Sequence, residues 1–500
     1  MNQGYTVAAV AAVVLATVLV GGFGLRISRT TSDFYVASRT VRPRLNAAAI
    51  SGEYLSAASF LGIAGLVLVH GPDMLWYPVG YTAGYLVLLV FVAAPLRRSG
   101  AYTLPDFAEE RLESRRVRSL VGVLVVGAGW LYLVPQLQGA GLTLKILTGA
   151  PGWFGDVLVA SVVVLAVAAG GMRSITFVQA FQYWLKLTAL LVPAVFLLLA
   201  WRGDGGPHVS FGDLGLDGQD SVFRAEHPLY ATYGLIVATF LGTMGLPHVV
   251  VRFYTSPGGR EARRTTVVVL FLIGAFYLLP PVYGALGRLY APELVTGGDA
   301  DAAVLLLPDR VIGGLGGDLL GALVAGGAFA AFLSTASGLT MAVAGVLSQD
   351  VLPARGVRHF RLATLLAMAV PLAGALLVSR VPVADAVGMA FAVSASSFCP
   401  LLVLGIWWRR LTPPGAAAGL LLGGGSALVA VGITMSGAVR PPGWAHTLLA
   451  WPAVWSVPVG FLAMVLVSLA TRGRIPPGTN AAMARLHLPE ELHSARGAVR

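Results

Sequence analysis

The stretch Ile50-Ser51-Gly52-Glu53-Tyr54-Leu55-Ser56-Ala57-Ala58-Ser59-Phe60 combines a carboxylate with hydroxyls and a glycine. It lies inside an apolar run over residues 45–69, long enough to cross a bilayer, which takes about 20 residues. Glu53 stands about 12 Å deep in this run at 1.5 Å per residue. A carboxylate at that depth costs roughly 2.5–3.5 kcal/mol on insertion scales, so it indicates a functional role. The surrounding hydroxyls and glycine predict an interrupted helix whose free carbonyls face a cavity. The alternative is a Glu that only packs against a neighbouring helix.

Similar apolar runs recur along the whole 500-residue chain. Apolar residues make up 56% of the sequence and charged residues 11%, whereas soluble domains contain about 25% charged residues. Soluble and disordered classes are therefore excluded, and the chain is predicted to be one all-α integral membrane domain. The thirteen predicted spans are 5–25, 45–69, 74–95, 119–148, 153–170, 177–201, 229–250, 265–287, 318–346, 362–380, 384–408, 416–437 and 451–471.

The basic residues predict the orientation. Most of the 34 Lys and Arg residues fall in segments on one side of the predicted membrane, and that side is normally cytoplasmic. The N-terminus is therefore expected outside and the C-terminus in the cytoplasm, in the plasma (inner) membrane. The net charge of +11 is explained by this topology, so no nucleic acid is expected as a partner.

Common catalytic motifs are missing from the sequence. It contains no P-loop, GxSxG or HExxH motif, so no enzyme is expected. The lone Cys399 excludes an intrachain disulfide and a Cys-rich metal cluster. No organic cofactor and no obligatory protein partner are expected either.

A second polar fragment lies in the span 318–346. Residues three and four positions apart share a helix face, so the hydroxyls of Ser334 and Thr335 are expected near the carbonyl of Ala331. Three hard oxygens together form part of an alkali-cation site. The alternative is that both hydroxyls bond to their own helix at a close interface.

Other polar residues fall at different depths. Lys186 is deep in its span and is expected to be paired or to face a cavity, whereas Lys145 is expected to reach the membrane surface. Asp385, His248 and Arg252 stand near span ends, where solvation or pairing with loops is the simpler expectation.

Several stretches together resemble a known family. The chain resembles the sodium:solute symporter family over nearly its whole length, and within it the cation–acetate (short monocarboxylate) symporters. The matching stretches, in family order, are Ser32-Asp33-Phe34-Tyr35-Val36-Ala37, Gly52 to Gly62, Gly242 to Arg252, Arg260-Glu261-Ala262-Arg263, Gly338-Leu339-Thr340, Gly388-Met389-Ala390-Phe391-Ala392 and Trp408-Arg409-Arg410-Leu411-Thr412.

The resemblance implies a LeuT-type fold of two five-helix repeats with inverted topology. Residues 1–28 would be an extra N-terminal transmembrane helix and 29–411 the transporter core, with repeats over about 45–201 and 229–408. Residues 412–471 would add two helices, and 472–500 would form a cytoplasmic tail. The first span of each repeat carries an interruption, at Gly52 to Ser59 and at Gly242 to Pro247, which is typical of a central binding site.

The resemblance also implies where ligands bind. Sodium would be held by the carbonyls of Gly52, Leu55 and Ala331 and by the hydroxyls of Ser334 and Thr335. Cation–acetate members are expected to be apolar at these last two positions, whereas proline and sugar members carry hydroxyls there. The hydroxyls of this chain therefore favour sodium as the coupling ion, but they leave the identity of the solute open. The residues implied to bind the substrate are Ser59, Tyr132, Gln136, Thr239 and Thr243.

The function implied is sodium-coupled symport of a short-chain monocarboxylate such as acetate. The open alternatives are sodium- or proton-coupled symport of another small solute, proline-like or sugar-like, and a non-transporting membrane sensor. Glu53 is expected to line the cavity beside the cation path, where its charge favours the cation or its protonation substitutes for sodium.

Overall fold

The computed structural model describes residues 2–27, 31–211, 227–296, 299–351, 356–378, 383–439 and 443–489, and regular structure within these ranges is entirely helical. The longer helices are α1 (Gln3–Ile27), α3 (Pro43–Tyr54), α4 (Ile63–His70), α5 (Trp76–Phe91), α7 (Leu104–Leu112), α8 (Arg115–Thr148), α9 (Gly152–Gly203), α10 (Pro228–Gly245), α12 (Gly259–Tyr277), α13 (Pro280–Tyr290), α15 (Ala303–Ile312), α16 (Gly314–Val346), α17 (Val357–Leu377), α18 (Val383–Trp407), α20 (Ser426–Ser436), α22 (Ala453–Ala470) and α23 (Thr479–His487). The shorter ones include α2 (Thr31–Val36), α6 (Ala93–Ser99), α11 (Pro247–Phe253), α14 (Glu293–Thr296), α19 (Pro413–Gly419) and α21 (Trp444–Ala450).

Eleven helical segments in the described residues are long and apolar enough to cross a membrane. This confirms an all-α membrane protein, while the exact number of thirteen spans stays a prediction. Helix α9 covers two predicted spans, 153–170 and 177–201, and consists of two helical parts that meet at a kink between them. It changes conformation at Gly171, whose φ of 54° lies in the left-handed region that favours glycine. A sequence pattern does not show whether a helix ends or only bends there.

The first predicted interruption is confirmed. Helix α3 ends at Tyr54, and a π-helical turn, η2 (Ala58–Gly62), then leads into α4. Leu55, between them, has φ −73° and ψ 87°, outside the helical region. The predicted span 45–69 is thus two helical pieces around a short non-helical segment, whose backbone groups need partners from other helices.

The second predicted interruption is also confirmed. Helix α10 ends at Gly245 and α11 starts at Pro247, with Leu246 extended between them (φ −61°, ψ 118°). Proline disfavours the helical conformation of the residue before it and lacks the N–H that a continuous helix would use. The break is therefore encoded locally by Pro247.

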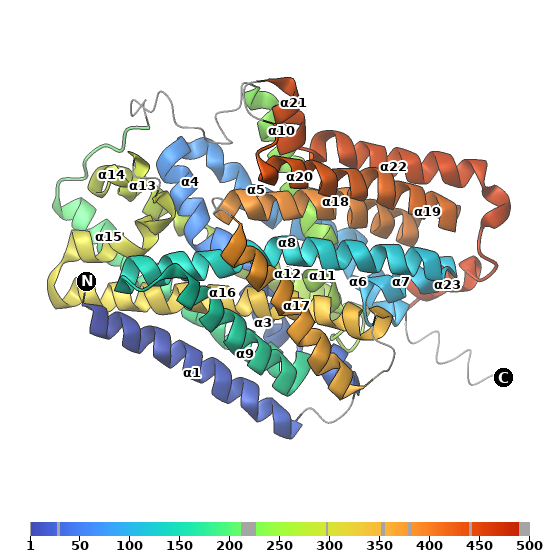
Figure 1. The fold of residues 1–500 in the computed structure, drawn as a ribbon, viewed down its shortest axis with the longest axis horizontal. Coiled ribbons are helices and arrows are strands. Elements are labelled where there is room, and N and C mark those ends of the chain that lie inside the picture. Colours follow the sequence, from blue (N-terminus) through green and yellow to red (C-terminus); the bar gives the residue numbers. More distant parts are fainter. Residues whose placement is uncertain are drawn as a thin grey trace.

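The two broken helices lie in the middle of the bundle. Helices α8 and α16 cross the centre of the molecule, with α9 against them, while α1 runs along one edge and α19 and α22 lie at the opposite edge (Figure 1). Helix α16 is buried along most of its length, and its many Gly and Ala residues allow close approach to α9. Outer faces carry exposed apolar side chains such as Phe271 and Leu229, as a lipid-facing surface requires.

Candidate transport site

Three of the five oxygens predicted to form a cation site accept hydrogen bonds from the side-chain nitrogen of Lys186. Lys186 Nζ on α9 donates to the carbonyls of Gly52 and Leu55, the latter at 2.7 Å, and to Ser334 Oγ at 2.9 Å. The lysine is completely buried. An ammonium has three N–H donors, so each one has an acceptor here. The lysine therefore places a cation among the predicted ligands and confirms the expectation that Lys186 is paired.

The other predicted oxygens are also engaged. Ser334 Oγ donates to the Ala331 carbonyl at 3.1 Å, and Thr335 Oγ1 donates to the Glu53 carbonyl at 2.6 Å. The hydroxyl of Thr335 thus compensates a backbone group that the break in α3 leaves free. Sodium binding by this set remains a prediction, and a sodium ion would have to share the oxygens with Lys186.

Glu53 lies beside this cluster in a buried ion pair. Its Oε2 accepts a hydrogen bond from Arg252 Nε on α11, and the two side chains are only 2% and 1% exposed. Arg252 also donates to Thr176 Oγ1 at 2.9 Å. The expectation that Arg252 is solvated or paired with a loop is wrong, because α11 turns inward after the break at Leu246. A role for Glu53 beside the cation path stays a prediction.

His248, four residues before Arg252, is also buried, with 1% exposure. Neither of its ring nitrogens has a hydrogen-bond partner in the described part of the chain. Its ring meets that of Tyr132 edge-on, with centroids 5.5 Å apart. The solvated environment expected from its position in the sequence is therefore wrong. The i, i+4 spacing of the two residues, which places both on one helix face, was the signal that could have shown this.

The predicted substrate residues lie around the two breaks. Thr243 Oγ1 lies 2.7 Å from the hydroxyl of Tyr54, which joins the broken end of α3 to α10. Thr243 and Thr239 both donate to carbonyls of their own helix. Ser59 Oγ lies 2.9 Å from the hydroxyl of Tyr277. These hydroxyls already have protein partners, so they would have to exchange them to contact a solute.

Gln136 is different, because only half of its amide is engaged. Its Oε1 accepts a hydrogen bond from the backbone N–H of Ala57 at 3.1 Å, which compensates another group freed by the break. Its Nε2 is buried and has no partner among the described residues. The Nε2 group therefore keeps its two N–H donors unpartnered among the described residues, next to the non-helical segment of α3.

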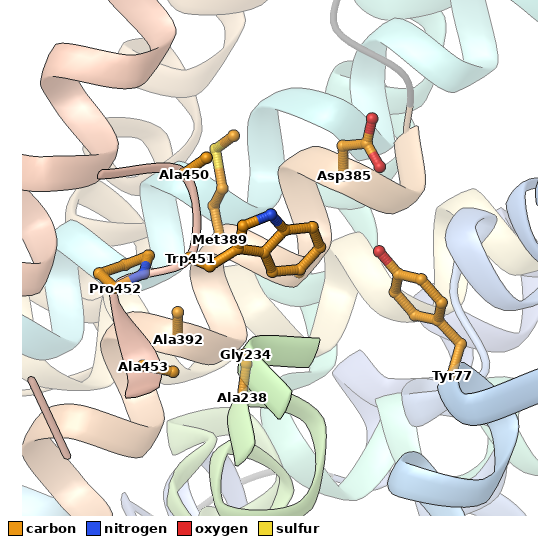
Figure 2. A pocket seen from close by; sticks show the side chains of 11 residues that line it. Tyr77, Gly234, Ala238, Asp385, Met389, Ala392, Ala450, Trp451, Pro452 and Ala453 are labelled. Atoms are coloured by element: carbon orange, nitrogen blue, oxygen red, sulfur yellow. The ribbon is translucent and has the colours of Figure 1, made fainter. Parts of the chain in front are cut away.

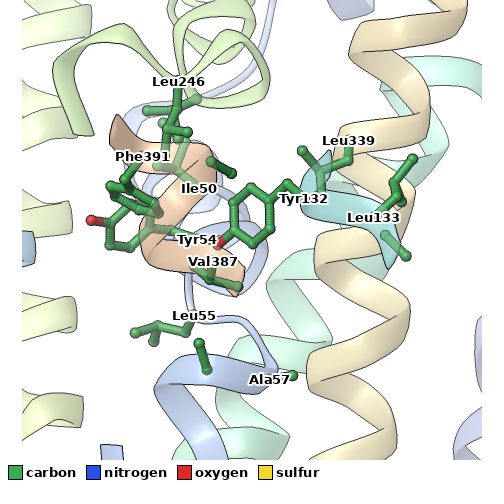
Figure 3. Close-up of a cluster of buried hydrophobic side chains, with 14 of the residues drawn as sticks. Ile50, Tyr54, Leu55, Ala57, Tyr132, Leu133, Leu246, Leu339, Val387 and Phe391 are labelled. Carbon is green, nitrogen blue, oxygen red and sulfur yellow. The ribbon is translucent and has the colours of Figure 1, made fainter. Parts of the chain in front are cut away.

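Tyr132 lies in the apolar cluster that fills the centre. Figure 3 shows its ring beside Tyr54 and Phe391, with Leu133 on the same helix and Leu339 on α16 behind it. The centroids of Tyr132 and Phe391 are 6.0 Å apart. A small pocket adjoins this cluster, lined by Tyr132, His248 and Ser394 among apolar side chains.

A second, small pocket lies between α5, α10, α18 and the segment before α22. Figure 2 shows Asp385 and Tyr77 on one side of it and Trp451 and Met389 on the other. Asp385 is buried, with 7% exposure, so the expectation that it is solvated is wrong, while pairing with a loop stays a prediction. Neither Trp451 nor Tyr77 was expected at a site from the sequence.

These features define a class of protein. A membrane-embedded helical bundle in which two broken helices meet at buried polar groups is typical of secondary transporters. The comparison with known proteins agrees, because the sequence matches the model of the sodium:solute symporter family over residues 34–423. The chain belongs to the sodium:solute symporter family.

Curated relatives match along almost their whole length. The chain is 31% identical over 476 residues to the uncharacterized symporter YwcA of Bacillus subtilis, covering 90% of this chain and 91% of that protein. It is 31% identical over 487 residues to a monocarboxylic acid transporter of Corynebacterium glutamicum, covering 88% and 87%.

Solved structures confirm the fold. A substrate-bound, outward-open Na+-coupled sialic acid symporter matches with a TM-score of 0.68 at 14% identity, over 93% of this chain and 98% of that one. Mhp1, a nucleobase-cation-symport-1 family transporter in a closed conformation, matches with a TM-score of 0.55 at 14% identity, over 91% and 99%. The predicted LeuT-type fold is therefore confirmed.

Proposed function

We propose that this protein is a cation-coupled symporter that carries a short-chain monocarboxylate, such as acetate, across the membrane. The observation that carries the proposal is the free Gln136 donor at the broken segment of α3. A buried donor without a partner is unfavourable, and a carboxylate oxygen would compensate it. The relative from Corynebacterium glutamicum, a monocarboxylic acid transporter, supports the same class of solute.

The neighbouring groups suit a small monoanion. The hydroxyls of Tyr81 and Tyr85 are buried without hydrogen-bond partners in the described residues, and their rings pack against Tyr54 with centroids 6.0 and 4.8 Å away. Phe391 supplies an apolar surface in the same cluster, 4.8 Å from Tyr81. Hydroxyl and amide donors beside an aromatic surface match a carboxylate with a short alkyl group.

The charges point the same way. Glu53 and Arg252 compensate each other, which leaves the ammonium of Lys186 as one positive charge near the centre. One surplus positive charge in a site of low dielectric balances a monoanion and not a dianion.

The topology belongs to the same proposal. We place the N-terminus outside and the C-terminus in the cytoplasm, in the plasma membrane, with two inverted repeats over about 45–201 and 229–408. Helix α1 and the helices from α19 to α22, which lie at opposite edges (Figure 1), would be additions to this core. Sodium is the first candidate for the coupling cation, because the family and the sialic acid symporter are named for it.

Uptake into proteoliposomes tests the proposal. We expect saturable uptake of labelled pyruvate or acetate that exceeds equilibrium when an inward cation gradient is imposed, and no such uptake of proline or glucose. Accumulation of proline or a sugar instead would contradict the substrate class. A chain that accumulates none of these solutes but co-purifies with a signalling protein would support the sensor alternative.

Gln136→Leu should raise the KM for the monocarboxylate about tenfold to hundredfold, because a hydrogen bond to a charged group contributes about 1.5–3 kcal/mol. Uptake kinetics at saturating cation measure this. Gln138→Leu is the matched control on the same helix. Its amide donates to the carbonyls of Ala375 and Val378 at 3.2 and 3.1 Å, so its loss should leave KM unchanged. A KM within twofold of the unmodified value in Gln136→Leu would show that the solute does not contact this amide.

A further inference from the structure

The environment of Lys186 has the composition of a site for a small cation. Two backbone carbonyls from the broken end of α3 and one hydroxyl from α16 accept its three hydrogen bonds. The nitrogen is completely buried. Carbonyl and hydroxyl oxygens are the ligands that hard metal cations prefer in proteins, and here they bind an ammonium that belongs to the chain itself.

The sodium ion that the family implies does not fit together with this lysine. Gly52, Leu55 and Ser334 already accept from Lys186, while the hydroxyls of Ser334 and Thr335 are donated to the Ala331 and Glu53 carbonyls. A sodium ion among these oxygens would lie beside the ammonium, with strong repulsion between like charges at short range.

The charged groups around the lysine do not relieve this repulsion. Glu53 on α3 interacts electrostatically with Lys186, but its carboxylate is bound to Arg252 on α11. Helix α16 offers only hydroxyl and carbonyl groups to this site. No second carboxylate among the described residues is hydrogen-bonded to Lys186 that could balance a further positive charge.

We propose that the ammonium of Lys186 is the resident cation of this site and that transport proceeds without a sodium ion bound there. The lysine takes over the structural role of such an ion, because it ties the broken end of α3 to α16 from its position on α9. The part of this inference that concerns transport rests on the proposed symport function, whereas the assignment of Lys186 as the resident cation does not. The occupancy of the site can be measured without any solute.

Thermal unfolding of the detergent-solubilised protein provides that measurement. At constant ionic strength, exchange of N-methylglucamine chloride for sodium chloride should not change the melting temperature of the unmodified chain. Lys186→Ala removes the ammonium and frees the oxygens for an ion, so sodium should raise its melting temperature by a few degrees at about a hundred times its Kd. Lys145→Ala is the matched control, since Lys145 is exposed on α8, and it should behave like the unmodified chain.

A sodium-specific rise in the unmodified chain that Ser334→Ala abolishes would overturn the proposal, because it would place sodium at this site despite the lysine. Sodium-dependent uptake that Ser334→Ala leaves unchanged would support it, by placing the coupling sodium elsewhere. If Lys186→Ala does not fold, the sodium dependence of melting temperature and of uptake, compared between the unmodified chain and Ser334→Ala, still decides whether sodium occupies this site.

The outcomes separate this inference from the proposed function. Absence of monocarboxylate uptake together with the expected thermal behaviour would reject the substrate and keep the assignment of Lys186. Uptake of a monocarboxylate with a sodium effect that depends on Ser334 would keep the function and reject the assignment.

Discussion

Glu53→Gln should lower the yield of folded protein sharply and abolish transport. The substitution keeps the shape of the side chain but leaves Arg252, which is 1% exposed, without its carboxylate. Removing one partner of a buried ion pair costs about 3–5 kcal/mol, since the remaining charge stays buried without compensation. Fluorescence-detected size exclusion and thermal denaturation in detergent measure the effect.

An exposed pair supplies the matched control. Glu110 lies 3.9 Å from Arg485, with side chains 41% and 49% exposed, and exposed pairs contribute about 0–1 kcal/mol. Glu110→Gln should therefore change the melting temperature little. The double variant Glu53→Leu with Arg252→Met should recover much of the stability, because apolar replacements of buried pairs are often neutral or stabilising, but not transport. Unchanged stability of Glu53→Gln alone would mean that the pair does not hold α3 and α11 together.

Gly52→Ala should have a comparable effect through sterics alone. A Cβ atom at this position would lie 2.1 Å from the backbone oxygen of Gln179 on α9, far inside van der Waals contact. A backbone oxygen within a helix cannot rotate away, so α3 and α9 would have to separate. Overpacking of this kind costs about 1–3 kcal/mol or more, and separation would also pull the Gly52 carbonyl away from Lys186. We expect a lower melting temperature and loss of uptake.

Gly274→Ala is the control for this variant. No atom lies within 4 Å of the position that its Cβ would occupy, and alanine is about 0.8–1 kcal/mol better than glycine inside a helix. Its melting temperature should stay the same or rise. If Gly52→Ala matched this control in stability and uptake, the close approach of α3 and α9 would not be needed.

The fold class could be predicted from the sequence because its signals are local. Long apolar runs require a bilayer, and the non-helical points at Leu55 and Leu246 are marked by the Gly- and Ser-rich segment and by Pro247. The number of spans stays a prediction, although the boundary predicted between 153–170 and 177–201 coincides with the kink at Gly171. An apolar run in the sequence predicts that a segment lies in the bilayer, but it does not predict where the helix in that segment bends.

The sequence predicts many of the residues of the candidate site, but it does not predict which of them bind each other. The position of Ser334 over Ala331 follows from helix geometry on a single element, and the structure has this contact. The hydroxyl of Thr335, expected at the same carbonyl, donates instead to the Glu53 carbonyl on α3. The depths of Glu53 and Lys186 likewise indicated polar partners. Arg252 and His248 were misjudged because distance from a span end measures depth only for a continuous helix.

The sequence by itself determined the membrane class, the two interruptions and the residue types that meet at the centre. Only the tertiary structure decided which of them bind each other: Glu53 with Arg252, Gln136 with Ala57, and Lys186 with Gly52, Leu55 and Ser334. The physical reason is that a broken helix leaves carbonyl and N–H groups that must be compensated inside the bilayer. Whether a bound ion or a side chain 131 to 134 residues away in the sequence supplies the compensation depends on how α9 and α16 pack against α3.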